Sequence, residues 1–200
     1  MEKYGYQFSF GPWNIHEGAD PFGPTVRPSL AFDQKLETYK ELGFDAVQFH
    51  DDDAVPDLDQ LSPGQIGQAA GEMRKKLESF GLKAEFVAPR LWEHPDTIDG
   101  AFTSNNPQER QYAIDRAKKA ADIGRELGTN LMVVWLAREG TYIREAKDAA
   151  RATHQLLEAL NQLLAYDPDL RIAVEPKPNQ PMDLAYIPTI GHALALGFKT

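Results

Sequence analysis

Five short apolar runs constrain the fold of this 200-residue chain more than any other feature of its sequence. They begin near residues 6, 45, 83, 130 and 171, and a segment with helical periodicity follows each of them. Strands that alternate with helices form a parallel sheet with right-handed crossovers. No glycine-rich phosphate fingerprint follows the first run, which disfavours a dinucleotide-binding sheet. We therefore predict an α/β fold, a parallel (β/α)8 TIM barrel, in which about five of the eight βα units are present. Residues 1–200 are then a single N-terminal portion of the barrel, with the C-terminal units missing.

The expected elements can be placed along the chain from periodicity and capping residues. Strands are predicted at residues 6–10, 45–49, 83–87, 130–135 and 172–174, and helices at 32–42, 66–80, 107–127, 142–166 and 188–196. Asn106 is the predicted N-cap of the third helix, because Pro107 occupies the first helical position and Glu109 lies three residues after the cap.

Composition narrows the range of partners and compartments. The apolar fraction of 42% can supply a core, and the net charge of −9 argues against nucleic acid as a partner. The absence of cysteine excludes disulfides and thiolate metal sites and fits a reducing compartment. The chain does not start with a signal peptide, and no apolar run approaches the roughly 20 residues that span a bilayer. We expect a cytoplasmic protein with a small-molecule substrate and no membrane partner.

Two polar segments directly follow predicted strands and are candidates for chemistry. In the segment Glu175-Pro176-Lys177-Pro178, an acid and a base two residues apart project to the same side of an extended backbone that the prolines stiffen. The alternative is a proline-rich surface turn with one ion pair. In the other segment, Asp53 can hydrogen-bond His50 and fix its tautomer. The alternative there is an acidic helix N-cap.

Taken together, the motifs of this chain resemble those of xylose isomerase, most closely the shorter, actinobacterial-type class. The resemblance covers most of the chain. It rests on Phe10-Gly11-Pro12-Trp13, Asp20-Pro21-Phe22-Gly23, Phe49-His50-Asp51-Asp52-Asp53, Gly100-Ala101-Phe102-Thr103, Trp135 with Arg138-Glu139-Gly140, Glu175-Pro176-Lys177-Pro178-Asn179, and Pro188-Thr189-Ile190-Gly191-His192-Ala193.

The resemblance implies a metal-dependent aldose–ketose isomerase that converts D-xylose to D-xylulose, and possibly D-glucose to D-fructose, by ring opening and a hydride shift. By this resemblance His50 assists ring opening and Asp53 orients it, while Lys177 hydrogen-bonds the substrate oxygen at the reacting carbon. Glu175 matches a ligand of a divalent ion, Mg²⁺ or Mn²⁺, of which the complete enzyme holds two.

The resemblance also implies an aromatic sugar pocket. Trp13 and Trp135 match its walls, and Trp92 stands in a pocket loop where the family usually carries a phenylalanine. An ordinary core role is the alternative for each tryptophan. Phe22 matches a loop residue that reaches into a neighbouring subunit, which implies a homo-oligomer, a tetramer, for the full-length protein. The alternative for Phe22 is a mobile loop.

Three departures from the family pattern leave the function partly open. Ala88-Pro89-Arg90 replaces polar pocket groups and adds a cation, and Leu136-Ala137 replaces two glycines, so the preferred sugar is open. The remaining metal ligands of the family belong to later strands, so we expect these 200 residues alone to be inactive. One alternative is a related barrel isomerase or epimerase for another sugar. The other is a non-catalytic half barrel that assembles with a partner chain.

Overall fold

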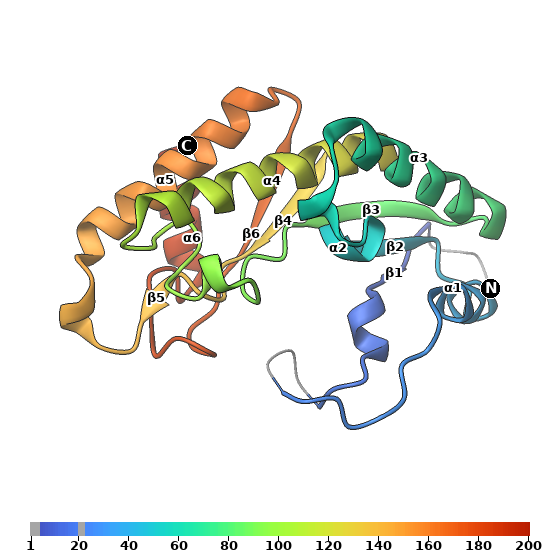
Figure 1. Cartoon of the computed structure of the whole chain (residues 1–200), viewed down its shortest axis with the longest axis horizontal. Coiled ribbons are helices and arrows are strands. Elements are labelled where there is room, and N and C mark those ends of the chain that lie inside the picture. The colour runs from blue at the N-terminus through green and yellow to red at the C-terminus, as the bar shows by residue number, and fades with distance from the viewer. Residues whose placement is uncertain (1–4, 20–22) are drawn as a thin grey trace. The chain divides into compact units, whose positions relative to one another are not determined.

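The structure is a computed structural model that describes residues 5–19 and 23–200 (Figure 1). The chain divides into two compact units. The first comprises Met1–Val87 with Ile123–Thr129, and the second comprises Ala88–Asp122 with Asn130–Thr200.

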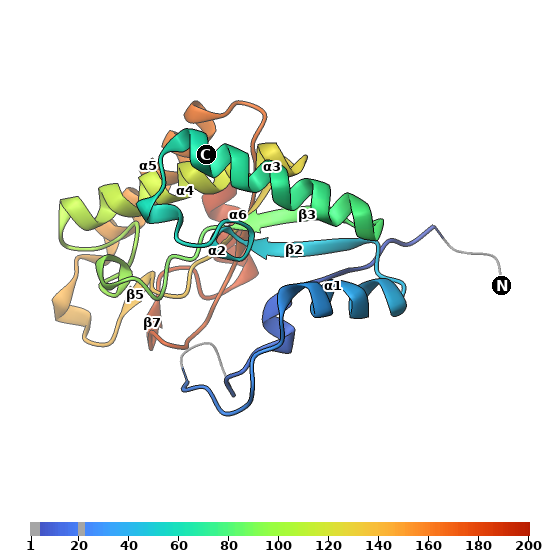
Figure 2. The same cartoon turned by 45° about the vertical axis from the view of Figure 1, so that its right-hand side comes forward.

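All five predicted strands are present, and they run parallel within each unit. The first unit orders them β1-β2-β3, and the second places β4 beside β6. Figure 2 shows the arrowheads of β2 and β3 pointing the same way, with α3 alongside both strands. The bounds are β1 (Ser9–Phe10), β2 (Ala46–His50), β3 (Lys83–Ala88), β4 (Leu131–Trp135) and β6 (Arg171–Glu175). β1 is shorter than predicted, and the parallel α/β arrangement is confirmed.

The helices follow the strands in the predicted order. Their bounds are α1 (Phe32–Glu41), α2 (Asp51–Ala54), α3 (Pro63–Phe80), α4 (Pro107–Leu127), α5 (Ala149–Tyr166) and α6 (Ile190–Gly197). Short 3-10 turns occur at η1 (Pro12–Ile15), η2 (Leu58–Gln60), η3 (Pro95–Thr97) and η4 (Arg144–Ala146). Two strands were not predicted, β5 (Gly140–Thr141) and β7 (Leu184–Ala185), which pair antiparallel. Two residues are too few to produce an alternating pattern.

Local capping explains where the helices begin and end. Asn106 caps α4 as predicted, since its side-chain oxygen accepts from the N–H of Gln108 at 3.0 Å. The predicted start of α5 at residue 142 is wrong. The carboxylate of Asp148 accepts from two backbone N–H groups, those of Ala150 and Arg151, at 3.0 and 3.1 Å. This N-cap starts the helix at Ala149, because it satisfies donors that a helix end leaves open.

Each unit has its own apolar core. In the first, Leu36 and Tyr39 of α1 and Val47 and Phe49 of β2 are fully buried. In the second, Met132 and Val134 of β4 are buried, together with Leu156, Leu160 and Leu163 of α5. The alternate residues of β4, which include Trp135, are only half-buried, so one face of β4 and β6 is less covered than the other. None of the helices in the described part of the chain is both long and apolar enough to cross a bilayer.

Two glycines, one inside α3 and one at its end, should respond oppositely to alanine. Gly71 lies inside the helix, and a Cβ there meets no atom within 4 Å, so Gly71→Ala should raise the free energy of unfolding by about 0.5–1 kcal/mol. Gly81 caps the helix at φ 71°, so Gly81→Ala should lower the free energy of unfolding by about 1 kcal/mol. Urea unfolding followed by circular dichroism measures both changes, and a loss of stability in Gly71→Ala would contradict this account.

Candidate active site

His50 and Asp53 form a polar pair at the carboxyl end of β2. Oδ2 of Asp53 lies 3.2 Å from Nδ1 of His50 and also accepts from the backbone N–H of His50 at 3.1 Å. The same carboxylate therefore caps α2 and contacts the imidazole, so the two alternative interpretations of this segment describe one arrangement. Burial, and then the negative charge of Asp53, raise the pKa of Tyr39 on the neighbouring helix α1.

Trp13 covers the imidazole of His50. The two ring centroids are 4.4 Å apart and the rings are inclined at 32°. Phe86 of β3 lies near the same indole, with centroids 6.4 Å apart. A Cβ on Gly11 would collide with the six-membered ring of Trp13. Gly11 is therefore needed at this position, because only a residue without a side chain lets the indole fold back over the backbone.

In the second unit, strand pairing places Trp135 beside Glu175. These residues are register partners at the ends of β4 and β6, so their side chains lie on the same face of the sheet. Lys177, two residues beyond Glu175, holds its ammonium 4.6 Å from the centroid of the Trp135 ring. A cation this close to an indole face is in a favourable cation–π position. A carboxylate, an ammonium and an aromatic face thus meet at the carboxyl end of two strands.

Trp92 lies behind Trp135 and is almost fully enclosed. Its ring meets that of Trp135 edge-on, with centroids 4.6 Å apart and an interplanar angle of 77°. Arg138 ties this loop to the segment after β4, because its Nε donates to the carbonyl of Trp92 at 3.0 Å. Burial lowers the pKa of Arg138 from its ordinary value, and Tyr142 opposes that change. Trp135, rather than Trp92, therefore offers the accessible aromatic face.

A buried carboxylate joins two motifs for which no chemical role was predicted. Glu139 is 3% exposed and accepts from the backbone N–H of Phe102 at 2.8 Å and from the hydroxyl of Thr103. Burial raises the pKa of Glu139, although these hydrogen bonds and the charge of Lys147 act in the opposite direction. Lys147 in turn donates to the carbonyl of Thr103 at 3.1 Å and pairs with Asp99 at 3.3 Å. The loop at 99–104 is thereby fixed to the loop after β4.

The same loop also holds the backbone that carries Lys177. The carbonyl of Glu139 accepts from the N–H of Tyr186 at 3.0 Å, and the carbonyl of Ile187 accepts from the N–H of Lys177 at 3.2 Å. Gly140 permits this approach, since a Cβ there would lie 2.6 Å from the carbonyl oxygen of Leu184. Backbone hydrogen bonds thus connect the loop at Glu139 with the segment at Lys177.

The structure places seven of the eight residues that the sequence singled out. Trp13, His50 and Asp53 gather in the first unit. The second unit contains Trp92, Trp135, Glu175 and Lys177. Phe22 lies outside the described residues. Sequence reasoning assigned no role to Arg138 and Glu139, although a charged pair that follows an apolar strand was a signal that could have been used.

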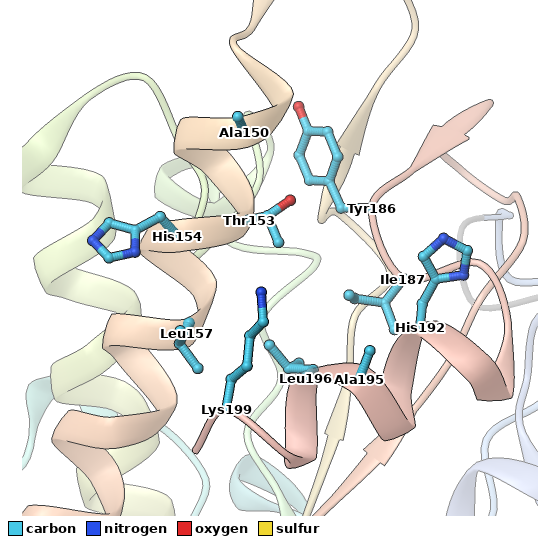
Figure 3. A pocket seen from close by; sticks show the side chains of 10 residues that line it. All are labelled: Ala150, Thr153, His154, Leu157, Tyr186, Ile187, His192, Ala195, Leu196 and Lys199. Atoms are coloured by element: carbon cyan, nitrogen blue, oxygen red, sulfur yellow. The ribbon is translucent and has the colours of Figure 1, made fainter.

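A pocket of about 280 Å³ lies elsewhere, between α5 and α6 (Figure 3). Its polar lining comes from the imidazoles of His154 and His192, the amine of Lys199 and the hydroxyls of Thr153 and Tyr186. His154 pairs with Glu158 on its own helix, and the ring of His192 is hydrogen-bonded to Thr189. None of the eight candidate site residues lines this pocket, so we do not assign the site to it.

The described residues do not by themselves fit a metal ion. Glu175 is exposed and offers one carboxylate. Over residues 5–19 and 23–200, no group of three or more His, Asp or Glu side chains could hold an ion. One carboxylate is too little for Mg²⁺ or Mn²⁺, which otherwise keep their water ligands.

Comparison with known proteins identifies the family. The family described as "Xylose isomerase-like TIM barrel" matches residues 36–198. The chain belongs to this family. Membership confirms the predicted TIM-barrel fold class and the resemblance at the level of the family.

Among relatives of this xylose isomerase-like chain is the xylose isomerase of Thermus thermophilus. It is 37% identical over 198 residues, which cover 96% of the chain and 51% of the relative. The chain therefore spans about half the length of this relative.

Solved structures show the same fold. A crystal structure of D-psicose 3-epimerase in the presence of D-fructose superposes with a TM-score of 0.66 at 13% identity, covering 97% of this chain and 60% of that one. A xylose isomerase domain protein from Alicyclobacillus acidocaldarius subsp. acidocaldarius gives a TM-score of 0.57 at 12% identity, covering 96% and 59%. At such identities the likeness extends to the fold alone.

The raised pKa of Glu139 predicts a pH-dependent stability. Because burial raises this pKa above the ordinary 4.5, the folded state holds the proton more tightly than the unfolded state. The free energy of unfolding should therefore fall as pH rises from about 4.5 through the raised pKa. In Glu139→Gln, which can still accept from Phe102, this fall should be absent.

Urea unfolding between about pH 4.5 and 8 measures this difference. Glu145→Gln is the matched control, since Glu145 is exposed and its loss should leave the pH dependence of the wild type intact. Equal slopes in the wild type and Glu139→Gln would show that Glu139 does not titrate as described.

Proposed function

We propose that this chain carries part of the active site of a metal-dependent aldose–ketose isomerase that converts D-xylose to D-xylulose, and possibly D-glucose to D-fructose. The observation that carries the proposal is the ammonium of Lys177 on the indole of Trp135, next to the carboxylate of Glu175. The xylose isomerase at 37% identity supplies the reaction to which these groups are assigned.

In this proposal His50 and Asp53 serve ring opening. A cyclic sugar opens when a base removes the proton of its anomeric hydroxyl and an acid supplies one to the ring oxygen. Asp53 lies 3.2 Å from Nδ1 of His50 and so favours a proton on that nitrogen, which leaves Nε2 to exchange a proton with the sugar. Trp13 covers one face of the imidazole and limits its rotation.

Lys177 acts on the open-chain sugar. Isomerisation moves a hydrogen and its electron pair from C2 to C1, and negative charge grows on the C1 carbonyl oxygen. The C2 hydroxyl loses its proton and becomes the ketone, and the C1 oxygen takes up a proton and becomes a hydroxyl. An ammonium that donates to this oxygen stabilises that charge. Trp135 holds the ammonium in place and excludes water from one side, which protects the migrating hydrogen from exchange.

The proposal concerns a protein longer than the described residues. A divalent ion, Mg²⁺ or Mn²⁺, would need ligands in addition to Glu175, and the relative is about twice as long as this chain. We therefore propose that residues 1–200 form the N-terminal portion of a barrel domain, and that the 200-residue chain alone gives no ketose from D-xylose in the presence of either ion.

Activity of the full-length gene product tests the function. With D-xylose and Mg²⁺ or Mn²⁺ it should form D-xylulose, and deuterium placed at C2 of the aldose should appear at C1 of the ketose rather than exchange with water. Lys177→Met should lower kcat/KM by about 10²–10³, the usual cost of removing one donor at a developing oxyanion. Product analysis by NMR measures both effects.

The control variant is Lys75→Met, which removes an exposed lysine of α3 and should leave kcat/KM unchanged. Failure to form any ketose from a panel of aldoses would refute the isomerase assignment. Formation of epimers instead would favour a related sugar epimerase, the second candidate, which the replacement of polar pocket groups by Ala88-Pro89-Arg90 supports.

A non-catalytic role as half of a split barrel is a further candidate, and one surface favours it. α6 and its C-cap residue expose an apolar stripe of Ile190, Leu194 and Phe198, which are 71%, 59% and 90% accessible. These residues are four apart, so they lie on one side of the helix. β6 also leaves Ala173 and Glu175 exposed. A polypeptide that supplied further βα units could cover both features.

Association of the 200-residue chain tests this candidate. The wild type should exceed its monomer mass of 22.4 kDa in light scattering, because the stripe and the open strand favour pairing. Leu194→Asp with Phe198→Asp should shift it toward the monomer, whereas Tyr142→Asp, which changes an exposed aromatic residue outside α6, should not. A monomeric wild type would count against assembly through this surface.

A further inference from the structure

Arg90 is held in a defined position directly after β3. Its guanidinium carbon lies 5.5 Å from the centroid of the Trp92 ring, and its Nη1 lies 3.2 Å from Oε1 of Glu93. The Arg90 side chain is 17% exposed, whereas that of Glu93 is 48% exposed. Stacking on an indole reduces the rotamer freedom that an arginine loses on binding a ligand. The guanidinium is therefore pre-organised at the carboxyl end of the strand.

Arg90 and Lys177 lie at the two ends of one aromatic pair. Arg90 stacks on Trp92, Trp92 meets Trp135 edge-on at 4.6 Å, and Lys177 lies 4.6 Å from the Trp135 centroid. Arg138 fixes the backbone of this arrangement through the Trp92 carbonyl. Two cations of the second unit are thus separated by two indoles, and both belong to segments that directly follow strands.

We infer that Arg90 is a specificity-determining residue that binds an anionic substituent, a carboxylate or a phosphate, on the sugar whose carbonyl oxygen meets Lys177. This inference deepens the proposed function and rests on it. A guanidinium presents a planar set of donors that matches two oxygens of a carboxylate or phosphate at once. A neutral hydroxyl offers no such match. The contact with Glu93 does not decide against this, since the Glu93 carboxylate is 48% exposed and a ligand anion can take its place beside the guanidinium.

The overall charge of the chain cannot by itself explain a preference for anionic sugars. The net charge of these 200 residues is −9, so their overall charge does not attract anions. Any selectivity for an anionic sugar must then come from cations next to the bound ligand, and Arg90 is the cation that we assign to this role.

Dissociation constants of matched sugars test the inference. Isothermal titration calorimetry of the full-length gene product would compare D-glucose with D-glucuronate, which adds a carboxylate, and with D-glucose 6-phosphate, which adds a phosphate. At least one anionic sugar should bind about tenfold more tightly than D-glucose, a difference of about 1.4 kcal/mol. The two anionic sugars distinguish a carboxylate from a phosphate.

Three variants connect the preference to Arg90. Arg90→Gln should bring the ratio of dissociation constants close to one, and Arg90→Lys, which keeps the charge but not the planar donors, should give an intermediate ratio. Arg151→Gln removes an exposed arginine of α5 with the same change in charge and should retain the wild-type ratio. If Arg90→Gln fails to fold, the ratio in Arg90→Lys decides.

The binding and activity measurements together distinguish failure of this inference from failure of the proposed function. Equal affinity for neutral and anionic sugars, or a preference that persists in the Arg90 variants, would overturn the inference and leave the isomerase assignment standing. If the wild type binds none of these sugars and isomerises no aldose, the proposed function fails with it.

Discussion

The parallel pairing of β4 with β6 is the constraint on which the second unit depends. It brings Trp135 level with Glu175. Lys177 follows two residues after Glu175, and its ammonium lies over the indole of Trp135. A shift of one residue would turn these side chains to the opposite face of the sheet. The regular hydrogen bonds of a parallel strand pair thus determine which polar groups meet at its carboxyl end.

The loops that complete this end are fixed by buried polar contacts rather than by apolar packing. Glu139 is buried, so its hydrogen bonds to Phe102 and Thr103 are costly to break. Its backbone carbonyl holds Tyr186, and the next residue, Ile187, holds the backbone of Lys177. Placement of the ammonium therefore depends on a carboxylate that takes no part in the proposed chemistry.

The sequence predicted the fold more completely than the site. Alternating apolar runs and helix caps such as Asn106 are local signals, so all five strands and the order of the helices could be predicted. The predicted start of α5 was wrong because the helical spacing of apolar residues continues into residues 142–148. The N-cap at Asp148 determines the actual start. The pairing of β5 with β7 could not be foreseen, because it joins two-residue segments that are distant along the chain.

The sequence by itself determined the strand–helix alternation, the residues that follow each strand and the family to which the chain belongs. Only the tertiary structure decided that Asp53 both caps α2 and contacts His50, that Arg90 and Lys177 flank one pair of indoles, and that Glu139 is buried. The physical reason is the distance along the chain over which each kind of interaction acts. Propensity, capping and periodicity act between neighbours along the chain, whereas stacking and burial depend on residues that only the folded backbone brings together.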